Sequence, residues 1–366
     1  MTMVHAFNPA EALLLDEWPP EDAGPIGSVA ILGVDDVAMA EVVAERVEQV
    51  TLYPRHIEAY ELARRVAIDR FAVSDAVVPP ADGALDAALL AMPQGRYVNR
   101  MILAAGRAAL REGGELWVAG PTSGGAKPTI ADATSLLGEG EVVAFKHRQR
   151  LARAIKRDGV ALPEWSTEPG VAPGSFGGFE IDLDGARTAI KTRPGVFAWN
   201  GLDETARLLM EHIDVPEGGV VANPCCGAGT IGLYAAMSGA GRVTMSDHDL
   251  LAVASARAGV EANGLSERVE ITACGCERVG PPGACDLVVA FPPMDERRET
   301  TEGGRPMPRA VERIVAAAPE ALKPDGRLVV AIPAYASLDK PLKRAGLAGR
   351  VLAESRRATL IEAHRA

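Results

Sequence analysis

The stretch NPCCGAGT, residues 223–230, decides the fold of the chain. It ends an apolar run, GVVANP (residues 219–224), and leads into a helical pattern, GTIGLYAAMS (residues 229–238). Gly227 and Gly229 allow the backbone to turn tightly and to approach a ligand, and the start of the helix offers unpaired N–H groups. The sequence therefore predicts a strand, a glycine turn and a helix in succession.

An acidic residue stands at the end of the next predicted strand. Asp247 closes RVTMSD, residues 242–247, about 18 residues after the turn. At this place in an α/β sheet, an acid accepts hydrogen bonds from both hydroxyl groups of a ribose. Together the turn and Asp247 predict a nucleoside cofactor site. An ordinary structural turn remains the alternative for the glycine pair.

Strands and helices alternate on both sides of this motif. The second half predicts strands at 219–224, 242–247, 269–274, 285–291 and 326–332, and helices at 202–213, 229–238, 250–263 and 311–322. A similar series fills the first half, beginning with the apolar run SVAILGV at residues 28–34. Alternation of this kind predicts an α/β fold with parallel sheets and helices on both faces.

The two halves resemble each other. Asp86 and Asp286 each precede an apolar strand, then a helix, then the glycine of the next strand, Gly114 or Gly326. The separation is 28 positions in the first half and 40 in the second, so the second half carries an insertion after its double proline. Open α/β sheets build substrate sites just beyond the carboxyl ends of their strands. We therefore expect the second half to carry the activity.

Length and composition fit a two-domain globular protein. The chain has 366 residues, 48% of them hydrophobic and 24% charged, and we expect domains at 1–157 and 181–366 with a Pro- and Gly-rich linker at 158–180. It has no apolar run of ~18 residues and no recognisable secretory signal, so we expect a cytoplasmic protein without a membrane partner. Five cysteines, without CxxC pairing, argue against a disulfide framework and predict no metal.

Positive charge gathers in one segment, although the net charge is −11. Residues 141–157 hold six Lys or Arg and one acid. If this segment is one strand, it would bury Val143, Phe145 and Leu151 on one face. The basic side chains that would then be available to nucleic acid are Lys146, Arg148, Arg150 and Arg153. A solvated basic face is the alternative.

The order of motifs is similar to that of a known family. PGVF at 194–197, GLDETARLL at 201–209, the glycine turn, Asp247, ANG at 262–264 and DLVVAFPP at 286–293 follow one another. In this order they resemble the methyltransferase small domain of bacterial ribosomal RNA guanine-N2 methyltransferases. The resemblance implies two tandem Rossmann-like class I methyltransferase folds, the first degenerate, with S-adenosylmethionine as cofactor and ribosomal RNA as partner.

The resemblance also implies the site residues. The cofactor-binding set is Asn223, Cys225, Gly227, Gly229, Asp247 and Cys274, and the catalytic turn is Phe291, Pro292, Pro293 and Met294. The family has Asp where this chain has Asn223, usually Asp or Asn near Cys274, and Asn-Pro-Pro-aromatic at the catalytic turn. In the first half, Gly33 stands without a glycine-rich turn, and Ala91-Met92-Pro93 occupies the place of the catalytic motif.

The altered catalytic turn bears directly on guanine chemistry. In the family, the Asn side chain and the next carbonyl accept hydrogen bonds from the guanine amino group, which is otherwise a poor nucleophile. Phe291 cannot accept a hydrogen bond, so the Pro292 carbonyl remains, with Asp295 or Glu296 as candidate second acceptors. A small-metabolite methyltransferase and a non-catalytic RNA or protein interaction module are therefore the alternatives to a ribosomal RNA methyltransferase.

Overall fold

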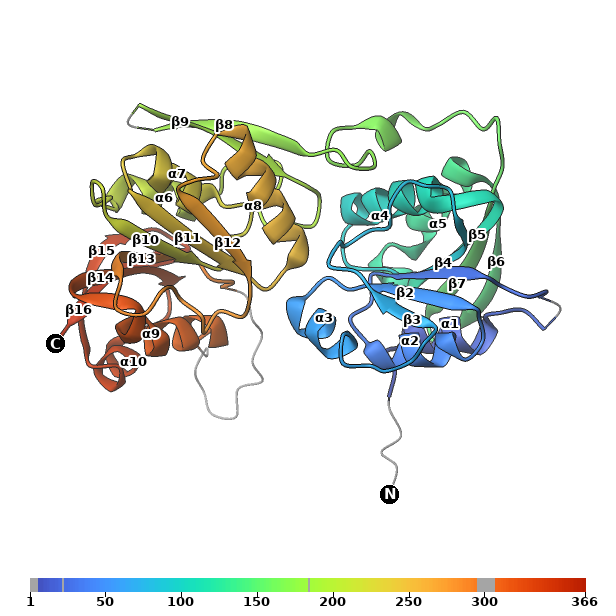
Figure 1. Cartoon of the computed structure of the whole chain (residues 1–366), viewed down its shortest axis with the longest axis horizontal. Coiled ribbons are helices and arrows are strands. Elements are labelled where there is room, and N and C mark those ends of the chain that lie inside the picture. Colours follow the sequence, from blue (N-terminus) through green and yellow to red (C-terminus); the bar gives the residue numbers. More distant parts are fainter. Residues whose placement is uncertain (1–5, 22, 184, 295–306) are drawn as a thin grey trace, which may run out of the picture. The chain divides into compact units, whose positions relative to one another are not determined.

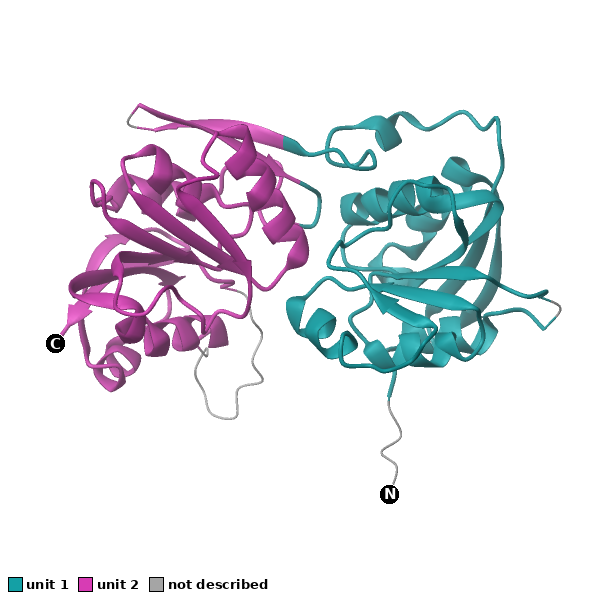
Figure 2. Ribbon diagram, in the orientation of Figure 1, with its two compact units in different colours: residues 1–177, 193–195 teal, residues 178–192, 196–366 magenta. Residues whose placement is uncertain are grey.

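The chain folds into two compact units (Figure 2). The computed structural model describes residues 6–21, 23–183, 185–294 and 307–366. Unit 1 comprises residues 1–177 and 193–195, and unit 2 comprises residues 178–192 and 196–366. Most of the expected linker therefore groups with unit 1, where the Arg100 guanidinium lies 4.8 Å from the centre of the Trp165 ring.

Unit 1 is a seven-stranded mixed sheet in the order β3-β2-β1-β4-β5-β7-β6. The strands are β1 (Ser28–Leu32), β2 (Gln49–Tyr53), β3 (Phe71–Val73), β4 (Leu85–Ala91), β5 (Leu110–Pro121), β6 (Gly138–Lys146) and β7 (Gln149–Lys156). The helices are α1 (Pro9–Glu17), α2 (Val37–Ala44), α3 (Ile57–Ala63), α4 (Arg96–Ala109) and α5 (Ala126–Leu137), with 3₁₀ turns η1 (Thr122–Gly124) and η2 (Glu164–Thr167). Neighbours pair in parallel except at β7, which is antiparallel to both β5 and β6. The alternating pattern did not reveal this reversed strand.

Helices cover both faces of the unit 1 sheet. Figure 1 shows α1, α2 and α3 on one face and α4 and α5 on the other. Alternate strand residues such as Val29, Ile31 and Leu89 pack with α1 and α2 in one apolar cluster, as the two-residue period of a strand requires. No helix in the described ranges has the length and apolar character of a membrane span.

Unit 2 repeats this architecture in the order β12-β11-β10-β13-β14-β16-β15. Its strands are β10 (Val220–Pro224), β11 (Arg242–Asp247), β12 (Val269–Ala273), β13 (Cys285–Ala290), β14 (Leu322–Pro333), β15 (Leu347–Glu354) and β16 (Ala358–Arg365), and β8 (Gly177–Leu183) pairs with β9 (Ala186–Thr192) in a separate hairpin. Its helices are α6 (Glu204–His212), α7 (Thr230–Met237), α8 (Leu250–Ala262), α9 (Arg309–Ala321) and α10 (Asp339–Arg344). Again one strand, β16, is antiparallel to its neighbours. The expected strands and helices of this half are confirmed to within a few residues.

The internal repeat extends to individual hydrogen bonds. Asp86 accepts the backbone N–H of Ser28 at 2.8 Å, and Asp286 accepts that of Val220 at 2.8 Å. Each aspartate thus fixes the first residue of the strand paired with its own. Each also pairs with a cation from the next strand along, Arg111 at 2.6 Å in unit 1 and Lys323 at 2.7 Å in unit 2.

The lowered pKa values of Asp86 and Asp286 predict that the protein loses stability in acid. Partial burial raises the pKa of Asp286, but the Lys323 and Val220 hydrogen bonds and the Lys323 charge outweigh it and lower the pKa; Asp86 behaves alike. A depressed pKa contributes stability above the unfolded value of ~3.9, which is lost as pH falls through the folded value. We expect the free energy of unfolding to fall below pH ~4. Asp86→Asn and Asp286→Asn should each make the free energy of unfolding depend less on pH. At neutral pH, each substitution should lower the free energy of unfolding by about 1 kcal/mol or less. Urea titrations from pH 3 to 7 measure both effects, and an unchanged pH slope in the variants would contradict the assignment.

The basic segment forms a hairpin rather than one strand. His147 and Arg148, with φ of 49° and 62°, make the turn between β6 and β7. Leu151 is fully buried as expected, but the expectation for Val143 and Phe145 is wrong, because they are 39% and 57% exposed. The reason is that β6 is the edge strand of the sheet, and all its residues except one are exposed to solvent.

Candidate functional site

The glycine turn between β10 and α7 is built from left-handed backbone. Gly227 and Gly229 have φ of 55° and 82°, a region that costs an L side chain strain, and Cys225 is held there too at φ 52°. A Cβ added to Gly227 would meet no heavy atom of the described residues within 4 Å. One added to Gly229 would meet Met245 at 3.3 Å and Ala256 at 3.2 Å. The backbone at Gly227 is therefore open to a ligand, whereas a side chain at Gly229 would crowd Met245 and Ala256 as well as strain the backbone.

Asn223 ties this turn to the sheet. Its side-chain amide donates to the Val289 carbonyl at 2.9 Å, and its side-chain oxygen accepts the Gly232 N–H at 3.1 Å. The residue is 1% exposed. A neutral amide serves here because it must donate on one side and accept on the other, which a carboxylate cannot do. Asn223 therefore joins the strand before the turn to β13 and to helix α7.

Asp247 lies at the end of β11 beside the turn. Its carboxylate accepts the Gly227 N–H at 2.9 Å through one oxygen and the Asp249 N–H at 2.9 Å through the other. Each oxygen keeps a further lone pair for a ligand hydroxyl. Burial, with the nearby Asp249 charge, raises the pKa of Asp247 despite these two hydrogen bonds.

Cys274 follows β12 and lies next to Asp247. The backbone N–H of Cys274 donates to the Asp247 carbonyl at 3.0 Å, continuing the pairing of Asp247 with Ala273. The thiol is half-buried beside the Ser246 hydroxyl, and burial raises its pKa. The structure thus brings Cys225, Gly227, Asp247 and Cys274 together at the carboxyl ends of three neighbouring strands. In the described ranges, no group of three or more His, Cys, Asp or Glu is placed to hold a metal ion.

The turn Phe291–Met294 leaves the carboxyl end of β13, next to β10 in the sheet. Pro292 is buried and Pro293 is exposed. The half-buried Phe291 ring meets the Phe197 ring edge to face, with centroids 5.7 Å apart and planes at 89°. Phe197 is 66% exposed, so one ring of this pair is presented to solvent. Asp295 and Glu296, the candidate second acceptors, lie outside the described residues.

Two residues of this region were missed as site residues from sequence. Gly232 packs its helix against β11, because a Cβ there would stand 2.4 Å from the Met245 sulfur. Gly227, Gly229 and Gly232 form a GxGxxG pattern, whose third glycine permits close helix–strand packing, so this spacing could have identified it. Phe197 could not be found in this way, because no local pattern predicts its contact with Phe291.

At the corresponding edge of unit 1, a carboxylate is engaged by neighbouring residues of the same unit. Asp35, just after β1, accepts the backbone N–H groups of Arg55 at 2.8 Å and His56 at 3.0 Å, and lies 2.6 Å from the His56 ring nitrogen. The carboxylate thus comes from the turn after the first strand, whereas in unit 2 it comes from the end of the second. A Cβ on Gly33 would stand 2.4 Å from the Ala91 carbonyl, so this glycine is needed for packing.

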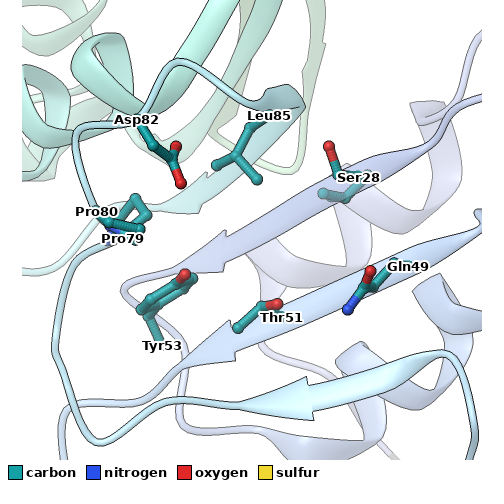
Figure 3. A pocket seen from close by; sticks show the side chains of 9 residues that line it. Ser28, Gln49, Thr51, Tyr53, Pro79, Pro80, Asp82 and Leu85 are labelled. Atoms are coloured by element: carbon teal, nitrogen blue, oxygen red, sulfur yellow. The ribbon is translucent and has the colours of Figure 1, made fainter.

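Unit 1 holds a cavity at a different place. It measures about 190 Å³ and lies along β1 and β2, beneath the loop that carries Pro79, Pro80 and Asp82 (Figure 3). Ser28 and Gln49, which begin the two strands, line it together with Tyr53 at the end of β2. The loop joins β3 to β4 without a helix, which leaves space over the sheet.

Comparison with known proteins places the chain in a family. Residues 187–360 match the family described as methyltransferase small domain. The ribosomal RNA small subunit methyltransferase C of Pseudomonas paraeruginosa (strain DSM 24068 / PA7) is 31% identical over 249 residues, 67% of this chain and 69% of that protein. The one from Chromohalobacter salexigens is 29% identical over 292 residues, 78% of this chain and 80% of that protein. The one from Pseudomonas entomophila is 30% identical over 212 residues, but the match spans only 60% of its length.

A solved structure shares the whole architecture. It is described as Thermus thermophilus 16S rRNA N2 G1207 methyltransferase (RsmC) in complex with AdoMet and guanosine, with a TM-score of 0.77 and 24% identity. The match covers 98% of this chain and 92% of that one, so the expected tandem class I methyltransferase fold is confirmed. With 31% identity to a relative over more than two thirds of the relative's length, the chain belongs to the ribosomal RNA small subunit methyltransferase C family.

Proposed function

We propose that the chain transfers a methyl group from S-adenosylmethionine to the N2 atom of a guanine in small-subunit ribosomal RNA, with unit 2 as the working half. The observation that carries this is the pairing of the open Gly227 turn with the Asp247 carboxylate. Asp247 retains lone pairs for the two ribose hydroxyls, and the Gly227 backbone faces free space. The residues present therefore fit a nucleoside cofactor. Family membership supports the methyl donor and the RNA substrate.

The chain's own residues supply binding and orientation. S-adenosylmethionine, when bound, supplies an electrophilic methyl group, so positioning contributes more than general base catalysis does. When the cofactor is bound, Asp247 would hold its ribose, Cys274 would lie beside its adenine, and the glycine turn would hold its methionine end. The Pro292 carbonyl accepts from the guanine amino group, while the Phe291 and Phe197 rings offer an apolar wall for the base.

Methyl transfer to ribosomal RNA tests this proposal. Small subunits and their extracted RNA, both free of the modification, are incubated with the protein and tritiated S-adenosylmethionine, and the RNA is digested to nucleosides. We expect tritium in N2-methylguanosine. Label in another nucleoside would overturn the assigned atom. Cofactor binding by calorimetry without any transfer to RNA would instead favour a small-metabolite enzyme, and absence of cofactor binding would favour a non-catalytic module.

The tip of the β6–β7 hairpin is the proposed RNA contact in unit 1. Two of the four expected basic residues are engaged by acids: Lys146 by Glu17, and Arg153 by Glu115 at 2.5 Å. The Arg150 guanidinium instead lies 4.8 Å from the centre of the exposed Phe145 ring, and Arg148 is exposed at the turn. An arginine beside an exposed aromatic ring suits a phosphate and a stacked base.

Buried polar atoms lie close to the hairpin tip. In the described part of the chain, Thr122 Oγ1, Gln149 Oε1 and Arg150 Nε are buried without a hydrogen-bond partner. Buried polar groups in folded proteins almost always have partners. The three residues are neighbours, because Thr122 donates its backbone N–H to the Arg148 carbonyl and Gln149 and Arg150 follow directly. These atoms are closed to solvent, so a phosphodiester would instead contact the exposed Arg148 side chain at the turn.

Charge reversal tests the hairpin contact. We expect the Arg148→Glu/Arg150→Glu variant to lose RNA affinity several-fold at low salt, and its salt slope to fall by about one unit for each lost phosphate contact. Filter binding of ribosomal RNA fragments from 50 to 200 mM salt measures both quantities. The variant Arg64→Glu/Arg65→Glu makes the same change of net charge at the end of α3 and serves as the control. Equal losses in both variants would show that only overall charge matters.

A further inference from the structure

The β15–β16 hairpin of unit 2 repeats the β6–β7 hairpin of unit 1 at its tip, residues 355–357. In unit 1 the Arg148 carbonyl accepts the backbone N–H of Thr122 at 2.9 Å. In unit 2 the Arg357 carbonyl accepts the backbone N–H of Ala334 at 3.0 Å. Thr122 and Ala334 each follow the proline that ends the parallel strand next to the hairpin, β5 or β14. The internal repeat therefore places an arginine at the same backbone position in both units.

Positive charge also gathers along this second hairpin. Residues 340–357 hold six Lys or Arg and one acid, the same balance as residues 141–157, in a chain of net charge −11. Arg356 and Arg357 are exposed at the tip, and no acid of the described residues forms an ion pair with either guanidinium. Lys146 of the first hairpin is, by contrast, engaged by an acid. Both charges at the second tip are therefore available to a partner.

The tip lies at the edge of the sheet that carries the candidate catalytic turn. Pro333 ends β14 and pairs with the first residue after the tip. On its other side β14 pairs with β13, whose carboxyl end leads into Phe291. Two strand spacings of ~4.8 Å separate β16 from β13, so the tip stands ~10 Å across the sheet from the turn. Ala290 pairs with Val330, three residues before Pro333, so the tip also projects ~10 Å beyond the end of β13.

We propose that Arg356 and Arg357 bind the phosphate backbone of the RNA next to the target guanine and so position that base at the Phe291 turn. The inference rests on the proposed function and gives both arginines a positioning role. A guanidinium donates to two phosphate oxygens at once, and phosphate contacts fix the register of a bound strand. Tyr335, 48% exposed, directly follows the residue that the Arg357 carbonyl holds. Arginines together with an exposed aromatic residue are typical of surfaces that bind single-stranded RNA.

Charge reversal at the tip tests this contact. The full chain carrying Arg356→Glu/Arg357→Glu is compared with the wild type for binding of ribosomal RNA fragments and for methyl transfer at varied RNA concentration. We expect RNA affinity at low salt to fall at least about fivefold, and the salt slope to fall by about one to two units. The KM for RNA should rise in proportion, while kcat falls less than about twofold, because the contact holds the substrate and leaves the reacting atoms alone.

Two further measurements separate positioning from damage to the fold. The melting temperature and the affinity for S-adenosylhomocysteine should be unchanged in the charge-reversal variant, because both side chains are exposed. Arg356→Lys/Arg357→Lys keeps the charge and should retain most of the RNA affinity. If the lysine variant loses as much affinity as the glutamate variant, the tip does not act through its charge and the proposal is wrong.

The matched control lies at the other end of the same hairpin. Lys343 and Arg344 are adjacent, exposed residues in the last turn of α10, just before β15 begins. Lys343→Glu/Arg344→Glu makes the same change of net charge and should lower RNA affinity less than about twofold. Similar losses in the two glutamate variants, or unaltered RNA binding in the tip variant, would overturn the proposal. A loss seen with assembled small subunits but not with extracted RNA would assign the tip to a protein partner instead.

The same measurements distinguish this contact from the proposed function. A wild-type protein that binds RNA through the tip but transfers no methyl group to it would contradict the proposed function, while the contact would still stand. A wild-type protein that methylates RNA with an unaltered KM in the tip variant would support the proposed function and overturn the contact. A wild-type protein that binds no RNA at low salt would overturn both.

Discussion

Replacing Asp247 by alanine is expected to weaken S-adenosylmethionine binding by ~1.5 to 3 kcal/mol, the cost of losing charge-assisted hydrogen bonds. This corresponds to roughly a 10- to 150-fold rise in the dissociation constant. The variant would lose two interactions, because the carboxylate holds the Gly227 N–H at 2.9 Å and, in the proposed function, accepts hydrogen bonds from the ribose. Calorimetric titration of the variant with S-adenosylmethionine and S-adenosylhomocysteine gives the measurement.

The matched control is Asp35→Ala in unit 1. Asp35 also accepts two backbone N–H groups at the carboxyl edge of a parallel sheet, those of Arg55 and His56, so its loss should cost comparable stability. It should leave cofactor affinity unchanged, because no open glycine turn adjoins it. Unchanged affinity in Asp247→Ala, or weakened binding in Asp35→Ala alone, would contradict the assignment of the cofactor to unit 2.

The pH dependence of cofactor affinity is a second test of the role of Asp247. Burial raises the pKa of this carboxyl group, so it becomes protonated at a higher pH than the ~3.9 of an ordinary aspartate. Cofactor affinity should therefore fall on acidification while most exposed aspartates are still ionised. Binding that stays constant down to pH 4 would show that the ionised form of Asp247 is not required.

Phe291→Asn is expected to raise methyl transfer to guanine-containing RNA tenfold or more. The amide oxygen would accept from the guanine amino group at a place where the wild-type turn offers only the Pro292 carbonyl. One preorganised polar group of this kind is typically worth ~3 kcal/mol, so tenfold is a conservative expectation. The double proline is unaltered, and single-turnover transfer at saturating cofactor isolates the chemical step.

Phe291→Leu separates the gain of an amide from the loss of a ring. Leucine removes the contact with Phe197 without adding an acceptor, so it should not raise the rate. If both variants lower transfer while cofactor affinity is unchanged, the aromatic pair serves the natural substrate directly. In that case a base or another planar group stacks on the rings, and the assignment of guanine N2 should be dropped.

Local sequence was enough to predict the fold of unit 2 and the strand edge at which its glycine turn and Asp247 meet. The glycine turn, the apolar strand before it and Asp247 at the end of the next strand form one strand–turn–helix–strand unit, whose geometry depends on residues close in sequence. The equivalence of Asp86 and Asp286 was also visible as an internal repeat, and the structure shows why both halves have it. Each aspartate fixes the start of a central strand.

Contacts between distant segments were decided only by the tertiary structure. The exposure of Val143 and Phe145 follows from the place of β6 at the sheet edge, and strand order cannot be read from apolar periodicity. The neutralisation of Lys146 by Glu17 joins the basic hairpin to the end of α1. Periodicity specifies which face of an element is apolar, whereas the partners of that face depend on sheet order and register, which only the folded chain determines.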